Sequence, residues 1–364
     1  MGDPLQFFSE RLVPRPGRRR GILCNDLHNV HPRNALCYTA GVANGSRDIK
    51  AWYEAGHAPQ VPKIVTGLRG TGKSAFLEDL YNDLRARGVA RRRVRLIDAE
   101  CATFRRCATG EQALSLILEG VPPEGRVYFL LREAASLPEP EQILAALAQN
   151  PDYEVVATAS SRRLLQGPVR DIYGITPETY EVLPAPGIRS RSTEAECSRW
   201  NEILAKDILA HAHVMDVPTI VRLAGWLSDN LGTLISLRII SNAISSRYRM
   251  LSPHTVDGLL NALIAANLIE KAIRWDTEEE APLATGYRFY FTDPELRRAQ
   301  FGPAPYDETR RMALNRAWLW LRHESDEVFS ASGSREVDFV TRNGNVHAYW
   351  HVDVDGDGAV VRLD

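Results

Sequence analysis

The sequence predicts an α/β protein that starts with a parallel five-stranded sheet and continues into a helical region and a small α+β region. Short apolar runs alternate with helical periodicity over the first half of the chain, which is typical of a sheet covered by helices on both faces. Long helical stretches then replace the strands, and short strands return near the end. The predicted units are an irregular extension at 1–47 and domains at 48–190, 191–300 and 301–364.

The first domain contains five apolar runs that we expect to be its strands. The run RVYFLL is almost continuously apolar, as a strand buried on both faces should be. The expected strands are Val61–Gly67, Val94–Asp98, Arg126–Leu131, Tyr153–Ala159 and Thr179–Leu183. The helices expected between them are Ser74–Arg87, Glu111–Glu119 and Pro140–Gln149.

The helical region is expected to contain a winged helix at 216–275, followed by a hairpin at 281–293. In a DNA-binding module, the helix at 253–266 would enter the major groove. Its polar residues His254, Asp257 and Asn261 are not basic, which favours a packing role. A helix at 307–322 and short strands at 327–364 are expected to complete the chain.

Composition sets limits on the class of protein. The chain has 364 residues, is 44% hydrophobic and carries a net charge of −2, which excludes a chain built as a whole to coat nucleic acid. It has no apolar run of transmembrane length and no signal-peptide core near its start. The five cysteines are scattered. We therefore expect a cytoplasmic protein with reduced thiols and no membrane partner.

The most specific motif is GLRGTGKS, which matches G-x-x-x-x-G-K-[ST] between an expected strand and an expected helix. Its glycines let successive backbone N–H groups face one phosphate, and the helix N-terminus adds positive potential. Lys73 would reach the β and γ phosphates, and the Ser74 hydroxyl would bind Mg²⁺. The motif predicts binding of ATP or ADP with Mg²⁺ by Gly67, Leu68, Arg69, Gly70, Thr71, Gly72, Lys73, Ser74 and Ala75.

Two further strand ends carry candidate catalytic groups. P-loop ATPases usually place Asp-Glu after a buried strand, where the Asp supports Mg²⁺ and the Glu activates water. Here Arg132 and Glu133 occupy those positions, so Glu133 is the candidate base and Arg132 could instead pair with a phosphate. Asp98 is a possible substitute metal ligand, and Ser160 could contact the γ-phosphate or the attacking water.

Several stretches, in order, resemble a bacterial and archaeal family of AAA-type ATPases. They include KIVTGLRGTGKSAFLEDL, VYFLLREAASLPE, VVATASSRRLL and SREVDFV. Members join a P-loop domain to a winged-helix domain and a C-terminal domain related to restriction endonucleases. The resemblance implies that residues 67–74 hold phosphate, that Glu133 is the catalytic acid and that Ser160 or Ser161 is the sensor.

The sequence also departs from that family. Arg132 replaces the metal-supporting Asp, and Gly174-Ile175 stands where the family shows Gly-Arg. An arginine finger acting on another subunit could therefore be missing. The nearby alternatives are Arg162, Arg163 and Arg170.

The C-terminal region offers weaker patterns. Asp338 fits the first acid of an endonuclease-like core, but His351-Val352-Asp353 stands in place of Glu-x-Lys, so nuclease activity is not expected. The run at 353–364 begins like a calcium loop and is better interpreted as a hairpin turn. A zinc set of Cys24, His28, His31 and Cys37 matches no standard spacing.

The preferred hypothesis is an ATP-binding AAA-type ATPase with slow Mg²⁺-dependent hydrolysis, coupled to conformational switching or to a protein partner or self-association. One alternative is a nucleotide-dependent scaffold that does not hydrolyse ATP. The other is a DNA-acting defence or mobile-element ATPase.

Overall fold

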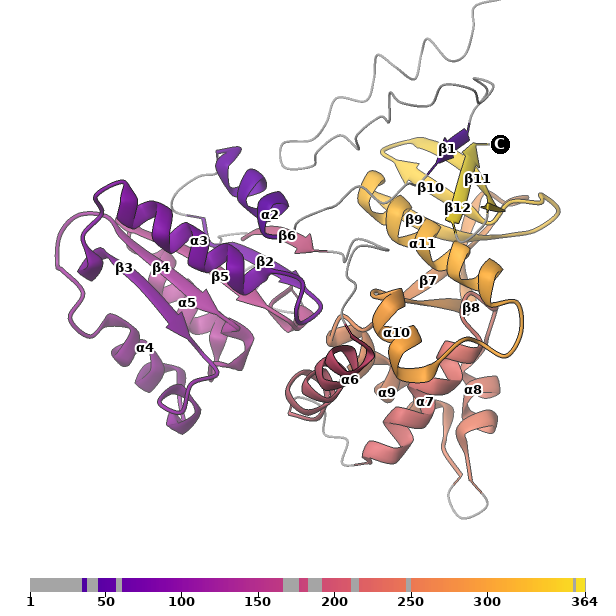
Figure 1. Cartoon of the computed structure of the whole chain (residues 1–364), viewed down its shortest axis with the longest axis horizontal. Coiled ribbons are helices and arrows are strands. Elements are labelled where there is room, and N and C mark those ends of the chain that lie inside the picture. The colour runs from indigo at the N-terminus through magenta and orange to yellow at the C-terminus, as the bar shows by residue number, and fades with distance from the viewer. Residues whose placement is uncertain are drawn as a thin grey trace, which may run out of the picture.

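The computed structural model describes residues 35–37, 45–56, 61–165, 177–182, 192–210, 216–246, 250–355 and 358–363. Figure 1 shows two bodies, which we call the phosphate-loop unit (the described part of 45–182) and the second unit (the described part of 192–363, with residues 35–37). No helix among these residues is long and apolar enough to cross a membrane.

The phosphate-loop unit is built on a five-stranded parallel sheet, as the sequence predicts, in the order β3-β4-β5-β2-β6. Strand β2 is buried throughout and pairs with β5 and β6. The carboxyl ends of β2, β4 and β5 face the same edge, where ligands bind in open α/β sheets. The strands are β2 (Lys63–Gly67), β3 (Val94–Asp98), β4 (Val127–Arg132), β5 (Tyr153–Ala159) and β6 (Glu178–Val182).

Helices cover both faces of this sheet and give it two apolar cores. Phe76 and Leu80 of α3 pack with β2 and β4 in one core, while Ile143 and Leu147 of α5 pack in the other. This arrangement is the α/β fold of P-loop NTPases. The helices are α2 (Gly45–Glu54), α3 (Lys73–Ala86), α4 (Gly110–Leu118) and α5 (Pro140–Ala148), with short 3-10 turns η1 (Arg91–Arg93), η2 (Phe104–Arg106), η3 (Ala134–Ser136) and η4 (Arg162–Leu165).

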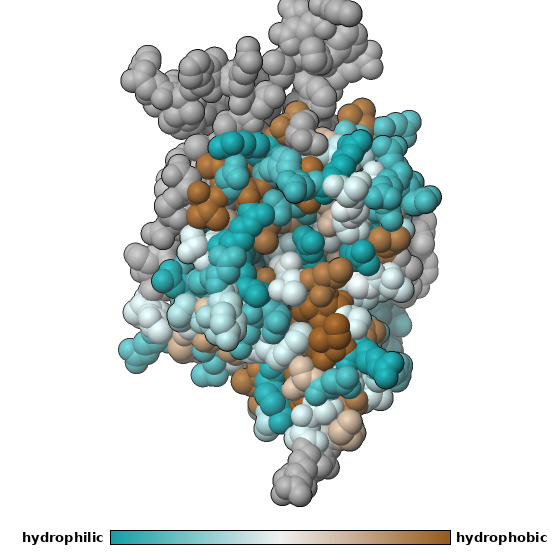
Figure 2. Space-filling view, turned by 90° about the vertical axis from the view of Figure 1, so that its right-hand side faces the viewer, coloured by the Kyte–Doolittle hydropathy of each residue, from teal (hydrophilic) through white to brown (hydrophobic). Residues whose placement is uncertain are grey.

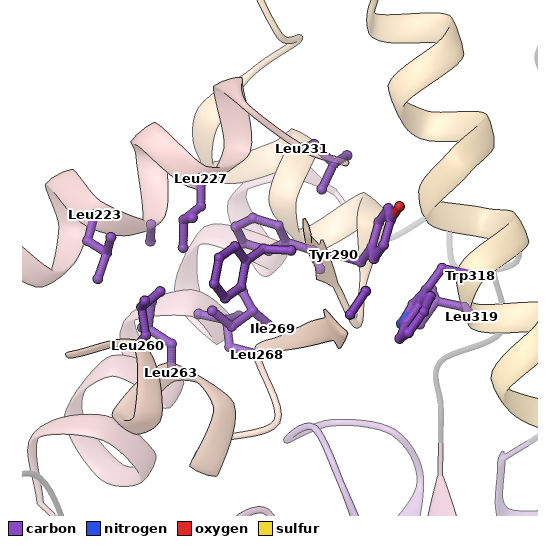
Figure 3. Close-up of a cluster of buried hydrophobic side chains, with 14 of the residues drawn as sticks. Leu223, Leu227, Leu231, Leu260, Leu263, Leu268, Ile269, Tyr290, Trp318 and Leu319 are labelled. Atoms are coloured by element: carbon purple, nitrogen blue, oxygen red, sulfur yellow. The ribbon is translucent and has the colours of Figure 1, made fainter. Parts of the chain in front are cut away.

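The second unit starts with α6, which continues directly into a π-helical segment, η6. Its largest core joins α7 and α9 to α11, and Figure 3 shows Leu223, Leu227 and Leu263 pointing toward one another. Tyr290 stacks on Trp318 with ring centroids 5.1 Å apart. The helices are α6 (Thr193–Glu202), η6 (Ile203–Leu209), α7 (Val217–Asp229), α8 (Leu237–Ile244), α9 (Pro253–Ala265), α10 (Pro294–Phe301) and α11 (Glu308–Glu324).

A seven-stranded sheet completes the second unit in the order β1-β12-β11-β10-β9-β7-β8. Strands β7 and β9 are parallel, and the other neighbours are antiparallel. The sheet therefore crosses the boundary expected at residue 300. Its strands are β1 (Ala35–Cys37), β7 (Ile269–Asp276), β8 (Ala281–Phe291), β9 (Glu327–Ser332), β10 (Phe339–Asn343), β11 (Val346–Asp355) and β12 (Gly358–Leu363).

Two local expectations were wrong. Residues 281–291 are one strand, and the hairpin is formed with β7; the turn Thr277–Glu280 contains no Gly or Pro to mark it. The extension expected to be irregular contains β1, which pairs with β12 at the sheet edge. A strand of three residues is too short to show alternation in a sequence.

The segment 216–275, expected to be a winged helix, contains α7, α8, α9 and nearly all of β7 in that order, and β8 follows after it. Ile235 of this segment forms an isolated bridge to Tyr287 of β8. The winged-helix interpretation itself stays a prediction. Figure 2 shows the face of the molecule at the right of Figure 1, where hydrophobic residues lie near the centre and in several smaller groups among hydrophilic ones.

Candidate nucleotide-binding site

The phosphate loop runs from the end of β2 to the start of α3. Its glycines Gly70 and Gly72 have φ values of 83° and 98°, the left-handed region that glycine adopts without strain. Gly72 is the N-cap of α3 and no side chain caps the helix, so its first N–H groups are left for a ligand. This backbone fits a phosphate group, as a P-loop requires.

Gly67 is required for a different reason, because the neighbouring strand passes very close. A Cβ atom at this position would lie 2.4 Å from the carbonyl oxygen of Val182, and its φ of 147° also disfavours a side chain. The close approach sets β6 against the start of the loop.

Lys73 is almost completely buried, with 3% of its surface exposed. Its Nζ donates hydrogen bonds to the carbonyl oxygens of Gly67 at 2.8 Å and Leu68 at 3.0 Å. Burial lowers the pKa of Lys73 to about 8, although the nearby charges of Glu133 and Asp207 oppose that shift. The lysine therefore points back into its own loop.

The remaining predicted loop residues divide by exposure. Thr71 is buried and donates to the carbonyl oxygen of Leu68 at 2.9 Å. Gly70 and Ala75 are exposed, and Ser74 is half-buried at the start of α3. Leu68 is 1% exposed and belongs to the hydrophobic core of the second unit.

Glu133 and Ser160 lie together, as their positions after neighbouring strands suggested. Glu133 is 6% exposed with a φ of 50°, and one carboxylate oxygen accepts the Ser160 N–H at 2.7 Å. The other carboxylate oxygen accepts the Ser160 hydroxyl at 2.7 Å. Each oxygen keeps a second lone pair. Ser161, the alternative sensor, instead accepts the Arg163 N–H through its hydroxyl at 3.2 Å.

Arg132 ends β4 and lies between two carboxylates. It forms an ion pair with Glu78 of α3 and another with Asp98 of β3, whose oxygen is 3.7 Å away. The Nε atom of Arg132 is buried and has no hydrogen-bond partner among the described residues. Since a guanidinium is cationic and cannot act as an acceptor, Arg132 offers no ligand to a Mg²⁺ ion at the position where a carboxylate would support it.

Arg69 connects the phosphate loop to the second unit. Its Nε and Nη2 bind the two carboxylate oxygens of Asp207 at 2.8 and 2.7 Å. Nη2 also donates to Glu100 at 2.7 Å. Asp207 lies in the π-helical segment and its side chain is 4% exposed, and burial raises its pKa. We call this contact the Arg69 clamp.

Arg199 is a candidate site residue that sequence reasoning missed. This α6 residue is 5% exposed and donates through Nε to the carbonyl oxygen of Arg69 at 2.6 Å. Its Nη1 donates to Glu196 and Asp293, whereas its buried Nη2 has no partner among the described residues. A single arginine in a helix carries no motif that could have identified it.

Asn267 holds the Ser160 end of the site from the second unit. Its Nδ2 donates to the carbonyl oxygen of Ser160 at 2.7 Å, and its Oδ1 accepts from Arg162 at 2.6 Å. Arg162 also pairs with Glu181 and Glu270. The guanidinium of Arg162 is therefore used inside the chain and is not free to act as an arginine finger. Arg170, Gly174 and Ile175 lie outside the described residues.

Glu270 is the centre of this second contact between the units. It is 3% exposed and accepts hydrogen bonds from Arg162, Trp318 and Arg322. Burial alone would raise its pKa, but Arg322 and Arg162 outweigh burial and lower it to about 2.

The C-terminal candidate acid is occupied by protein groups. Asp338 accepts hydrogen bonds from Arg310 at 2.6 Å and from the Val352 N–H at 2.8 Å, beside a cavity of about 620 Å³. Across the described ranges, no group of three or more His, Cys, Asp or Glu residues could hold a metal ion. Cys24, His28 and His31 of the zinc-like set, and part of the calcium-like run, lie outside those ranges.

Comparison with known proteins relates two parts of the chain to protein families. The family model described as an AAA domain matches residues 60–185. A domain of unknown function (DUF8612) matches residues 186–306. An uncharacterized protein of Haemophilus influenzae is 24% identical over 327 residues, which cover 80% of this chain and 82% of that protein. These matches support a relationship to AAA-type P-loop ATPases.

Proposed function

We propose that this chain binds ATP at residues 67–75 and passes the occupancy of that site to the second unit. The observation that carries this proposal is that the same loop both fits phosphate and contacts the second unit. Its backbone fits phosphate, while Leu68 and Arg69 are held by the second unit. A ligand that moves the loop must also move these contacts.

Two basic residues would change partners on binding. Lys73 would exchange the carbonyl oxygens of Gly67 and Leu68 for phosphate oxygens. Arg199 would direct its unpartnered Nη2 at the terminal phosphate, since its Nε already lies on the loop. Charge-assisted hydrogen bonds to phosphate are stronger than the neutral ones they replace.

The chemistry we propose is slow ATP hydrolysis. Glu133 would orient the attacking water through its free lone pairs, and the Ser160 hydroxyl would keep the carboxylate in place. Arg132, in the position of the metal-supporting carboxylate, lowers the expected rate. It also supports a second candidate function, a scaffold that holds nucleotide without turnover.

Calorimetric titration of the full chain with ATP tests the binding proposal. Lys73→Ala should weaken binding at least about tenfold, because it removes a charge-assisted contact. Lys50→Ala is the matched control, since Lys50 of α2 pairs with Asp83 of α3 outside the loop residues 67–75 and its side chain is partly exposed. Equal affinity of the wild type and Lys73→Ala would refute the site.

A phosphate-release assay separates the two functions. Turnover that is lost in Glu133→Gln supports the hydrolase. Tight binding without turnover in the wild type supports the scaffold.

A further inference from the structure

Arg132 lies where a nucleotide's metal ion would otherwise need support. Residue 132 pairs in register with Asp98 at the carboxyl edge of the sheet. Its guanidinium also contacts Glu78, which is one helical turn after Ser74 on α3. Residues four apart share a helix face, so the guanidinium lies beside the face that carries the Ser74 hydroxyl.

Arg132 itself gives a divalent cation no support at this place. A guanidinium repels Mg²⁺ and offers it no ligand oxygen. The two carboxylates that could have served as ligands, Asp98 and Glu78, are both paired with Arg132. Arg132 therefore brings to the strand edge a group that donates to anions and cannot ligate a cation.

Arg132 also has the means to bind a phosphate oxygen. Its Nε has no hydrogen-bond partner in the described part of the chain. Its two carboxylate partners have exposed side chains, 56% for Glu78 and 46% for Asp98, so these ion pairs are weak and can exchange. Arginine is well matched to phosphate in geometry and charge.

We propose that Arg132 replaces the metal ion as the neutralising cation, so that the site binds metal-free ATP or ADP. This inference rests on the proposed nucleotide site and specifies the form of the ligand. The phosphates would then meet Lys73, Arg199 and Arg132, which are three positive charges from the chain itself.

The test is calorimetric titration of the full chain with ATP in excess EDTA and, separately, in millimolar MgCl₂. For the wild type we expect the two dissociation constants to agree within about threefold. At an ordinary metal-dependent site, the affinity for ATP would be at least tenfold lower in EDTA than in MgCl₂. This comparison needs no variant, so it does not depend on how a substitution folds.

The charge-reversing variant Arg132→Asp supplies the converse. The ATP affinity of this variant should be at least tenfold lower than that of the wild type in EDTA and should recover in MgCl₂. The reason is that three carboxylates, those of residues 78, 98 and 132, then face the phosphates and can accept the Mg²⁺ ion. Arg92→Asp is the matched control, since Arg92 is exposed in η1 at the opposite edge of the sheet. It should keep the wild-type affinity in both buffers.

The outcomes distinguish the two proposals. Binding by the wild type only in MgCl₂, or unchanged metal-free binding by a folded Arg132→Asp protein, overturns this inference and leaves the nucleotide site standing. Absence of ATP binding in both buffers overturns the proposed function and this inference with it.

Discussion

Replacing Arg69 with methionine should loosen the contact of η6 with the phosphate loop while leaving the motif glycines, Lys73 and Ser74 unchanged. Arg69 is the one basic side chain that binds both oxygens of Asp207 among the described contacts. Methionine keeps most of the side-chain length and apolar volume, and removes the charge.

The magnitude follows from the burial of Asp207, whose side chain is 4% exposed. Removing one partner of a buried ion pair costs about 3–5 kcal/mol, because the other charge is left without compensation. At about 1.4 kcal/mol per tenfold, opening of this contact should become at least about a hundredfold more frequent.

Hydrogen–deuterium exchange of the Thr193–Leu209 amides measures that opening directly, as a loss of protection corrected for intrinsic rates. The effect should be smaller at pH 5 than at pH 7.5. Burial raises the pKa of Asp207, and loss of Arg69 should raise it further, so the unpaired carboxyl can take up a proton as the pH falls. Only the ionised form carries the penalty.

Two further variants make the reasoning refutable. Lys206→Met removes the neighbouring ion pairs with Glu100 and Glu202 and should change protection by less than about fivefold, since its side chain is partly exposed. Adding Asp207→Leu to Arg69→Met should restore part of the protection. If Arg69→Met lowers the protection of these amides by less than threefold, or if the double variant recovers none of it, the clamp does not hold the units together.

Three other predictions follow from the site. ATP affinity should fall about tenfold between pH 7 and pH 9 in calorimetry, because Lys73 has a pKa of about 8 and phosphate favours its charged form; Lys73→Met should lack this slope. Gly67→Ala should lower the free energy of unfolding by about 2 kcal/mol in chemical denaturation, because its Cβ meets the Val182 carbonyl. Gly88→Ala, with open space around the Cβ, should cost less, and equal losses would contradict the close approach. Glu270→Gln should lower the free energy of unfolding by up to about 3 kcal/mol at pH 7. Because the pKa of Glu270 is lower in the folded protein, its ionised carboxylate stabilises the fold above pH 4.5, and that contribution is lost as the pH falls toward 2. A variant as stable as the wild type at pH 7 would refute this.

The sheet and the loop could be predicted from the sequence because their signals are local. A parallel strand buried on both faces is a continuous apolar run, and β4 and β5 have that form. The ends of those strands then place Arg132, Glu133 and Ser160 at one edge without any knowledge of the tertiary structure.

The contacts between the units could not be predicted in this way. Arg69 and Asp207 are 138 residues apart, and the motif leaves residue 69 unspecified. Asn267 follows the end of α9 and has a φ of 55°, and an Asn with a positive φ is also common at ordinary helix ends. Their roles depend on which surfaces meet, and a pattern along one chain does not encode that.

The shared strand β7 has a mechanical consequence. It pairs with β8 on one side and β9 on the other, so the helices before it and the strands after it are joined through one sheet. Three separate domains in a row would be able to move relative to one another at two boundaries. In this arrangement one such boundary is left, between the phosphate-loop unit and the second unit. A small rotation of the second unit at the Arg69 clamp would therefore move the distant β1–β12 edge together with the rest of that unit (Figure 1).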